Sequence, residues 1–109
     1  MTYVELVEKI KSAYADVDAS FISEHVAFQF NIKGEAEGAF YVEIADGKVK
    51  VEPYEYFDRD VLVTTSAENL LNIASGKLDP VKAYFTGKIK VEGNLGKAVL
   101  LKELSAQKS

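Results

Sequence analysis

The sequence has 109 residues, 48% of them hydrophobic and 11% aromatic, with a formal net charge of −4. This length and composition are typical of one folded domain with a single core, so we expect residues 1–109 to form one domain. The acidic balance predicts no broad basic surface. Nucleic acid is therefore not an expected partner, and anionic lipid headgroups are not expected to drive binding, although local basic clusters stay open.

The sequence has no cysteine, which excludes disulfides, thiolate nucleophiles and cysteine metal sites. The first five residues lack the regions of a signal peptide, and no apolar run approaches the roughly 18 residues that span a bilayer. The last residues, Gln107-Lys108-Ser109, do not match a peroxisomal address. We therefore expect a cytoplasmic protein.

The chain opens with a predicted amphipathic helix. Thr2 and Glu5 form a capping-box pattern, and apolar residues recur behind them at helical spacing as far as Val17. The segment 16–23 then leads to an alternating run at 26–32, which predicts a half-buried strand.

Two further strands follow by short turns. The turn at 34–38 leads to a second alternating run at 40–44, and Asp46-Gly47 is a hairpin signal before the strand at 48–52. The three strands are predicted to form a meander.

The next elements are a long crossover and a strand–helix pair. The segment 52–60 mixes aromatic and acidic residues, and 61–63 predicts a fourth strand. Thr65 and Glu68 form a second capping-box pattern for a helix that Gly76 ends.

Three short elements complete the chain. Asp79 and Pro80 begin a helix as N-cap and first helical residue, and Gly87 ends it. Alternation at 88–92 predicts a fifth strand, and Asn94 caps a last helix. The whole succession predicts an α+β fold with the helices on one face of the sheet.

The last helix has too many apolar residues for one stripe. One broad face consists of Leu95, Ala98, Val99 and Leu101. A second stripe consists of Leu100 and Leu104. Two apolar faces need two apolar neighbours. One neighbour is the sheet, and three interpretations of the other stay open: further core, a hydrophobic ligand, or a partner surface.

The order of motifs from 76 to 96 resembles that of the sterol carrier protein 2 (SCP2) family. In that family a GKL-type turn with proline, an aromatic-ended helix, a GK-[LI]-K segment and a G-x-[LM]-G turn follow one another. The matching pieces are Gly76-Lys77-Leu78-Asp79-Pro80, Ala83-Tyr84-Phe85, Gly87-Lys88-Ile89-Lys90 and Gly93-Asn94-Leu95-Gly96. The strand and helix succession from about His25 to Leu104 is also similar.

This resemblance implies a mixed five-stranded sheet in the order 3-2-1-4-5 and an apolar tunnel between the sheet and its covering helices. It also implies that the last helix is a tunnel wall. Each implied lining residue fits a plain core position as well. The ten candidates are Phe28, Phe30, Val42, Leu70, Leu71, Ile73, Tyr84, Phe85, Leu100 and Leu104.

Two other features are weighed as sites. The crossover aromatics Tyr54, Tyr56 and Phe57 fit a lid, a membrane-touching tip or local packing, and the acids beside them lack the spacing of a calcium loop. His25, the single histidine, has no evident catalytic partner, so we expect a structural role. We expect no enzyme activity, no cofactor and no metal.

Our first hypothesis is a carrier that binds a fatty acid, acyl thioester, sterol-like or isoprenoid lipid, with transient membrane contact. The alternative is an interaction or scaffold domain that uses the same apolar surface for a homodimer or an enzyme partner. Because the sequence ends soon after Leu104, we expect the tunnel end to differ from that of longer relatives.

Overall fold

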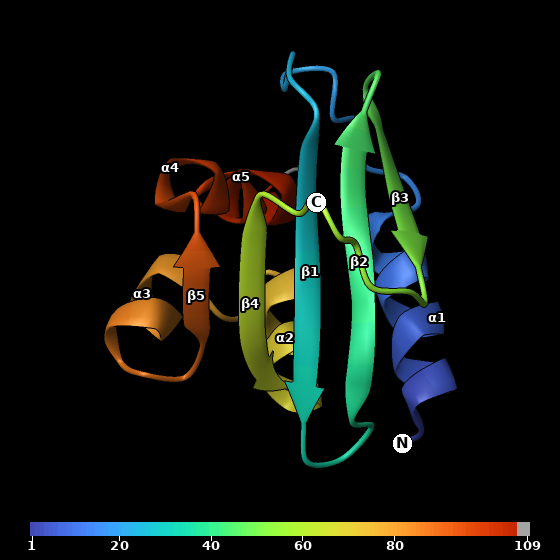
Figure 1. Ribbon diagram of the computed structural model, residues 1–109, viewed down its shortest axis with the longest axis vertical. Coiled ribbons are helices and arrows are strands. Elements are labelled where there is room, and N and C mark those ends of the chain that lie inside the picture. Colours follow the sequence, from blue (N-terminus) through green and yellow to red (C-terminus); the bar gives the residue numbers. More distant parts are fainter. Residues whose placement is uncertain (107–109) are drawn as a thin grey trace.

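A mixed five-stranded sheet is the framework of the computed structural model, which describes residues 1–106 (Figure 1). The strand order is β3-β2-β1-β4-β5, which confirms the predicted order. The central pair, β1 and β4, is parallel, and the other neighbours are antiparallel. The strands are β1 (Val26–Lys33), β2 (Gly38–Ala45), β3 (Lys48–Glu52), β4 (Val61–Ser66) and β5 (Lys90–Gly93). The residues compared with a peroxisomal address, 107–109, lie outside the described range.

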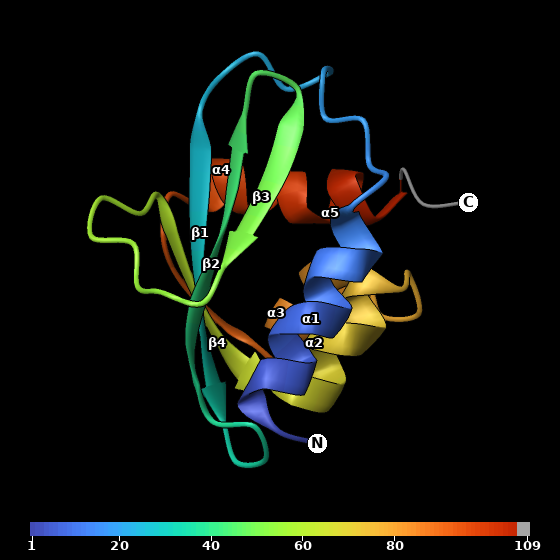
Figure 2. The same cartoon turned by 90° about the vertical axis from the view of Figure 1, so that its right-hand side faces the viewer.

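The helices gather on one face of the sheet, as the one-sided alternation of the strands requires. Figure 2 shows α1, α2, α3 and α5 on that face and the β3–β4 crossover on the opposite face. The remaining helix, α4, lies beside β5 at one end of the sheet (Figure 1). The helices are α1 (Tyr3–Tyr14), α2 (Ala67–Ala74), α3 (Pro80–Phe85), α4 (Leu95–Ala98) and α5 (Leu100–Ala106).

The core lies between the inner face of the sheet and these helices. Phe28, Phe30 and Phe40 are fully buried, and the Phe30 ring stacks on the other two with centroids 6.2 and 5.4 Å apart. Leu6 and Ile10 of α1 are fully buried in the same core. Each such side chain contributes about 1.5–3 kcal/mol on burial, so this packing is a large part of what stabilises the fold.

Local signals set most helix ends as predicted. Thr2 and Glu5 form the capping box of α1. Asp79 caps α3, with Pro80 as its first residue. Gly87 follows α3 with a φ of 78°, a left-handed conformation that suits glycine.

The start of α2 differs from the prediction by one residue. Ser66, not Thr65, is the N-cap, because its side chain accepts a hydrogen bond from the Asn69 amide at 3.2 Å. Thr65 belongs to β4, is buried, and donates its hydroxyl to the Lys88 carbonyl at 3.0 Å. Side chains in a strand alternate between faces, so Thr65 is committed to the core while Ser66 is available to cap.

The predicted last helix is divided into α4 and α5 around Val99. Val99 keeps helical dihedral angles, with φ −62° and ψ −25°. The Lys102 amide, however, donates to the Val99 carbonyl three residues back, which makes a tighter turn than that of an α-helix.

A pair of glycines tests how the chain passes from β5 to α4. Gly93 has a φ of 102°, and a Cβ there would lie 2.4 Å from the Asp60 carbonyl oxygen. Gly87 has a φ of 78° but no neighbour within 4 Å of an added Cβ. We expect Gly93→Ala to lower the free energy of unfolding by about 3 kcal/mol and Gly87→Ala by about 1 kcal/mol. Equilibrium urea unfolding measures both, and equal losses would contradict the close contact.

Candidate functional site

An open pocket of about 200 Å³ lies between the β4–β5 end of the sheet and the short helices α3, α4 and α5. Its lining is apolar, and the one polar group among the lining side chains is the hydroxyl of Tyr84. The lining residues are Val63, Pro80, Val81, Tyr84, Phe85, Ile89, Val91, Leu95, Ala98, Val99 and Leu101.

The pocket lies where the helices over the sheet are shortest. Helix α3 has six residues, of which Pro80 and Ala83 are buried, and α4 has four residues, none of them buried. Helices of this length cover β4 and β5 less completely than α1 and α2 cover the rest of the inner face. Val63, which is buried, and Val91, which is half-buried, line the pocket on its sheet side.

The side chains around the pocket mouth are exposed to an extent that is unusual for their type. Phe85 is 79% exposed, Leu95 52% and Val99 46%, and the Tyr84 ring meets the Phe85 ring edge-on at 5.5 Å. We call Tyr84, Phe85, Leu95 and Val99 the apolar rim. A cluster of exposed apolar side chains favours contact with a ligand or with another apolar surface.

Two ion pairs hold the pocket walls. Asp79 at the start of α3 pairs with Lys102 of α5 at 3.2 Å. Asp60 at the end of the crossover pairs with Lys97 of α4 at 3.1 Å. The hydrogen bond from the Val81 amide, supported by the one from Lys102, holds the pKa of Asp79 below its usual value.

The predicted lining residues occupy three kinds of place. Tyr84 and Phe85 line the pocket. Leu100 is half-buried against the core, and Leu71 lines a separate, more polar groove between α1 and α2. The other six are fully buried in the core: Phe28, Phe30, Val42, Leu70, Ile73 and Leu104. Contact of any of the ten with a ligand stays a prediction.

Most of the pocket lining was not among the predicted residues, although one sequence signal indicated part of it. The broad face of the last helix, which includes Leu95 and Val99, lines the pocket. In the second stripe, Leu104 is fully buried and Leu100 is half-buried against the core. Helical periodicity separates the two faces but does not say which of them meets the sheet.

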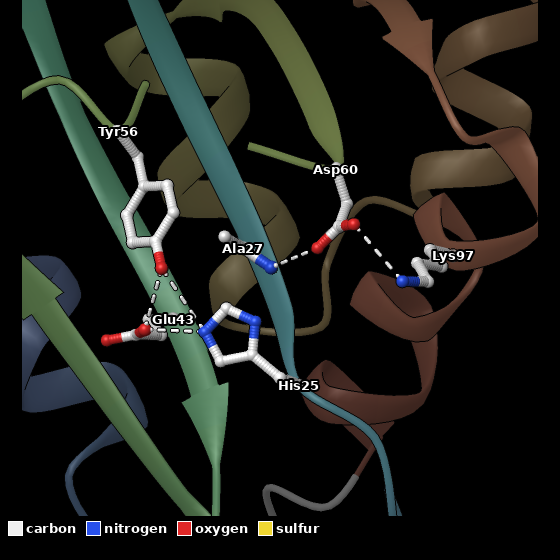
Figure 3. A network of polar contacts seen from close by, with 6 residues as sticks. All are labelled: His25, Ala27, Glu43, Tyr56, Asp60 and Lys97. Atoms are coloured by element: carbon white, nitrogen blue, oxygen red, sulfur yellow. Dashed lines mark hydrogen bonds and ion pairs between the residues drawn. The ribbon is translucent and has the colours of Figure 1, made fainter. Parts of the chain in front are cut away.

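A polar network on the opposite face of the sheet fastens the crossover (Figure 3). His25 Nε2 lies 2.6 Å from Glu43 Oε2, and the Tyr56 hydroxyl donates to the same oxygen at 3.0 Å. The Tyr56 ring also packs edge-on against Tyr41 with centroids 5.0 Å apart. The hydrogen bond from His25, with a further one from Tyr56, holds the pKa of Glu43 below its usual value despite partial burial.

This network settles how the crossover aromatics are placed. Tyr56 packs locally, whereas Tyr54 and Phe57 are 65% and 95% exposed. The crossover lies on the face away from α3, so it does not cover the pocket (Figure 2). Within residues 1–106, no three potential metal-ligating side chains converge, and no helix is long and apolar enough to cross a bilayer.

Asp60 joins the crossover, β1 and α4 through one side chain (Figure 3). One carboxylate oxygen accepts the Ala27 amide at 2.9 Å, and the other accepts Lys97 Nζ at 3.1 Å. Its backbone carbonyl accepts the Asn94 amide at 2.9 Å. Burial raises the pKa of Asp60, but the Ala27 amide and Lys97 outweigh that effect, so the pKa is lowered overall.

Asp60 gives a prediction for the pH dependence of stability. Because its folded-state pKa is lowered, the carboxylate contributes stability above its unfolded pKa, and this contribution is lost as the pH falls through the folded pKa. We expect Asp60→Asn to lower the free energy of unfolding by about 1–2 kcal/mol at pH 7 and to flatten its fall in acid. The exposed Asp58→Asn serves as control, and denaturant unfolding across pH tests both. An unchanged acid profile in Asp60→Asn would contradict the assignment.

Comparison with known families matches nearly the whole chain. The model of the SCP-2 sterol transfer family matches residues 6–105. Sterol carrier protein 2 of Bos taurus is 35% identical over 83 residues, which cover 73% of this chain and 15% of that protein. Hydroxysteroid dehydrogenase-like protein 2 of Mus musculus is 33% identical over 81 residues, which cover 73% and 16%. The chain thus matches about a sixth of the length of these relatives.

A solved structure of similar length shares the fold. Palmitated SCP2L2 from Aedes aegypti, determined in solution, has a TM-score of 0.69 and 28% identity over 96% of this chain and 95% of that one. The crystal structure of sterol carrier protein 2 like 2 from the same organism has a TM-score of 0.66 and 30% identity, covering 94% and 95%.

Proposed function

The chain belongs to the SCP-2 sterol transfer family, and we propose on that premise that it binds the hydrocarbon part of a lipid in the apolar pocket without catalysing a reaction. The observation that carries the proposal is the uncharged pocket walled by α3, α4 and α5 at the open end of the core. Residues 1–109 act in this proposal as one lipid-binding domain.

The chemistry of the lining supports a broad class of apolar ligand. Each methylene group moved from water into such a site contributes about 0.8 kcal/mol and asks for no precise polar partner. Fatty acids, acyl thioesters, sterol-like and isoprenoid lipids all offer such groups. The palmitate carried by the Aedes aegypti relative makes a saturated fatty acid the first ligand to test.

The size of the pocket bears on how a long chain is accommodated. Its volume of about 200 Å³ is below the roughly 300–1,000 Å³ of ordinary ligand pockets. A long acyl chain therefore extends over the apolar rim or displaces a wall. Helix α4, which buries none of its four residues, is the wall that moves at least cost.

The residues proposed from sequence fit this arrangement at two depths. Tyr84 and Phe85 contact the ligand at the mouth. Leu71 lies in the separate groove between α1 and α2 and is outside this arrangement. Leu100 and the six fully buried candidates lie in or against the core, and in the proposal they contact the ligand only when the pocket deepens.

The alternative function uses the same surface for a protein. The exposure of Phe85, Leu95 and Val99 also suits a second copy of the chain or an enzyme partner. Light scattering separates the two functions, because a stable homodimer doubles the mass without any lipid.

A matched pair of valines tests lipid binding. Val99 lines the pocket and is 46% exposed, while Val4 on α1 is 67% exposed and lies outside the pocket. Val99→Asp places a carboxylate against the hydrocarbon, so we expect palmitate affinity to fall at least about tenfold. We expect Val4→Asp to leave it within about twofold.

Displacement of a fluorescent fatty acid by palmitate measures both affinities. Circular dichroism and a thermal melt show that each variant is folded. Equal palmitate affinity in the two variants, or no binding by the unaltered protein, would overturn the proposed function.

A further inference from the structure

A pair of hydroxyl groups lies in the core just behind the apolar pocket. We call three nearly fully buried lining residues, Val63, Ile89 and Leu101, the pocket floor. Ser105 follows Leu101 by four residues on α5, so the two lie on the same side of the helix, about 6 Å apart along its axis. The Ser105 hydroxyl donates to the Leu101 carbonyl at 3.0 Å. A polar group therefore lies one helical turn behind the floor.

Tyr14 completes the pair from another helix. It is the last residue of α1, and the end of α1 meets α5 there (Figure 2). Tyr14 Oη lies 3.3 Å from Ser105 Oγ, and both residues are buried. Because the Ser105 proton is directed to the Leu101 carbonyl, Tyr14 is the donor in this hydrogen bond. Burial raises the pKa of the Tyr14 phenol, so the phenol keeps this proton at neutral pH.

The pair keeps an unused acceptor position. A phenol oxygen can accept a hydrogen bond while its own proton is donated elsewhere. In the part of the chain that the structure describes, Tyr14 Oη donates to Ser105 and accepts from no group. A ligand hydroxyl that reaches Tyr14 therefore finds an acceptor inside an otherwise apolar region of the core.

The remaining buried polar side chains of residues 1–106 offer nothing similar. Gln29 points to the outer face of the sheet, where its oxygen accepts the Tyr56 amide. Thr65 donates to the Lys88 carbonyl. None of the buried residues in this range carries a charge. A ligand carboxylate would have no buried cation to pair with, so it stays at the pocket mouth and the other end of the chain goes to the floor.

We infer that the Tyr14–Ser105 pair is the inner end of the lipid site and recognises a neutral hydroxyl on the buried end of the ligand. This inference rests on the proposed function. The acyl chain runs along α5 past Leu101, and its terminal hydroxyl donates to Tyr14 Oη. The ligand class is a lipid with polar groups at both ends, of which the ω-hydroxy fatty acids are the simplest members.

The hydrogen bond decides whether such a lipid binds. A hydroxyl moved from water into an apolar core without a partner weakens binding by about tenfold to a hundredfold. A hydrogen bond to Tyr14 offsets most of that loss. A wholly apolar site would therefore reject an ω-hydroxy fatty acid in favour of the plain fatty acid, whereas this site accepts both.

Two ligands that differ by one oxygen atom test the inference. The probes are palmitate and 16-hydroxyhexadecanoate, and displacement of a fluorescent fatty acid measures the affinity of each. We expect the unaltered protein to bind 16-hydroxyhexadecanoate within about fivefold of palmitate. A loss of about tenfold or more would show that the hydroxyl has no partner in the core, and would overturn the inference.

A double variant removes both oxygens of the pair. Either oxygen alone could still bond the ligand, so Tyr14→Phe is combined with Ser105→Ala. We expect this variant to lose about tenfold more affinity for 16-hydroxyhexadecanoate than for palmitate. Each ratio is taken within one variant, so a general loss of stability or of lipid binding cancels. An unchanged ratio would mean that the hydroxyl end stays in water, and would overturn the inference.

The control carries the same two changes elsewhere on α1. Tyr3→Phe removes a hydroxyl that donates to the Ala39 carbonyl, and Ser12→Ala alters an exposed residue. Neither residue lines the pocket. We expect the combined control to keep the ratio of the two affinities within about twofold of that of the unaltered protein. A control ratio that changes as much as that of the Tyr14 and Ser105 variant would overturn the inference.

A nuclear magnetic resonance measurement separates this inference from the proposed function. We expect nuclear Overhauser effects between the hydroxyl-bearing methylene of bound 16-hydroxyhexadecanoate and the ring protons of Tyr14. Absence of palmitate binding would overturn the proposed function and this inference together. Palmitate binding without contact between Tyr14 and the hydroxyl end of 16-hydroxyhexadecanoate would overturn this inference alone.

Discussion

The pocket depends on one constraint, which is that the inner face of the sheet must be covered along its whole width. Helices α1 and α2, of 12 and eight residues, close the core over most of the strands. The inner face of β5 is covered only by α3, α4 and α5, which have six, four and seven residues. These short helices leave an open pocket that Val63 and Val91 line. The same short elements carry the exposed rim.

The position of α4 is set by polar contacts more than by burial. Helix α4 buries no residue, yet the Asn94 amide and Lys97 both bond Asp60. Asp60 is in turn fixed to β1 through the Ala27 amide. A wall held by a few hydrogen bonds and one partly exposed ion pair yields at lower cost than one held by packed side chains. This arrangement is consistent with a pocket that enlarges around its ligand.

Sequence rules predicted the features that depend on residues nearby in the chain. They missed the features that depend on residues distant in the chain but close in the fold. The cap at Asp79 and the left-handed glycine at 87 follow from interactions within a few residues, and both were placed correctly. The α2 cap was misplaced by one residue because β4 extends as far as Ser66, and its last pairs, Thr65 with Ile32 and Ser66 with Lys33, join residues that are far apart in the sequence. The lining residue Val63 looks like any core strand residue until the short helices beside it are seen.

The most direct test of the central claim is a nuclear magnetic resonance measurement of contacts between palmitate and the isotope-labelled protein. The account predicts nuclear Overhauser effects from the acyl chain to the methyl groups of Val63, Val91 and Leu101, which line the pocket on three different elements. Contacts confined to the groove at Leu71, or no contacts at saturating palmitate, would contradict it.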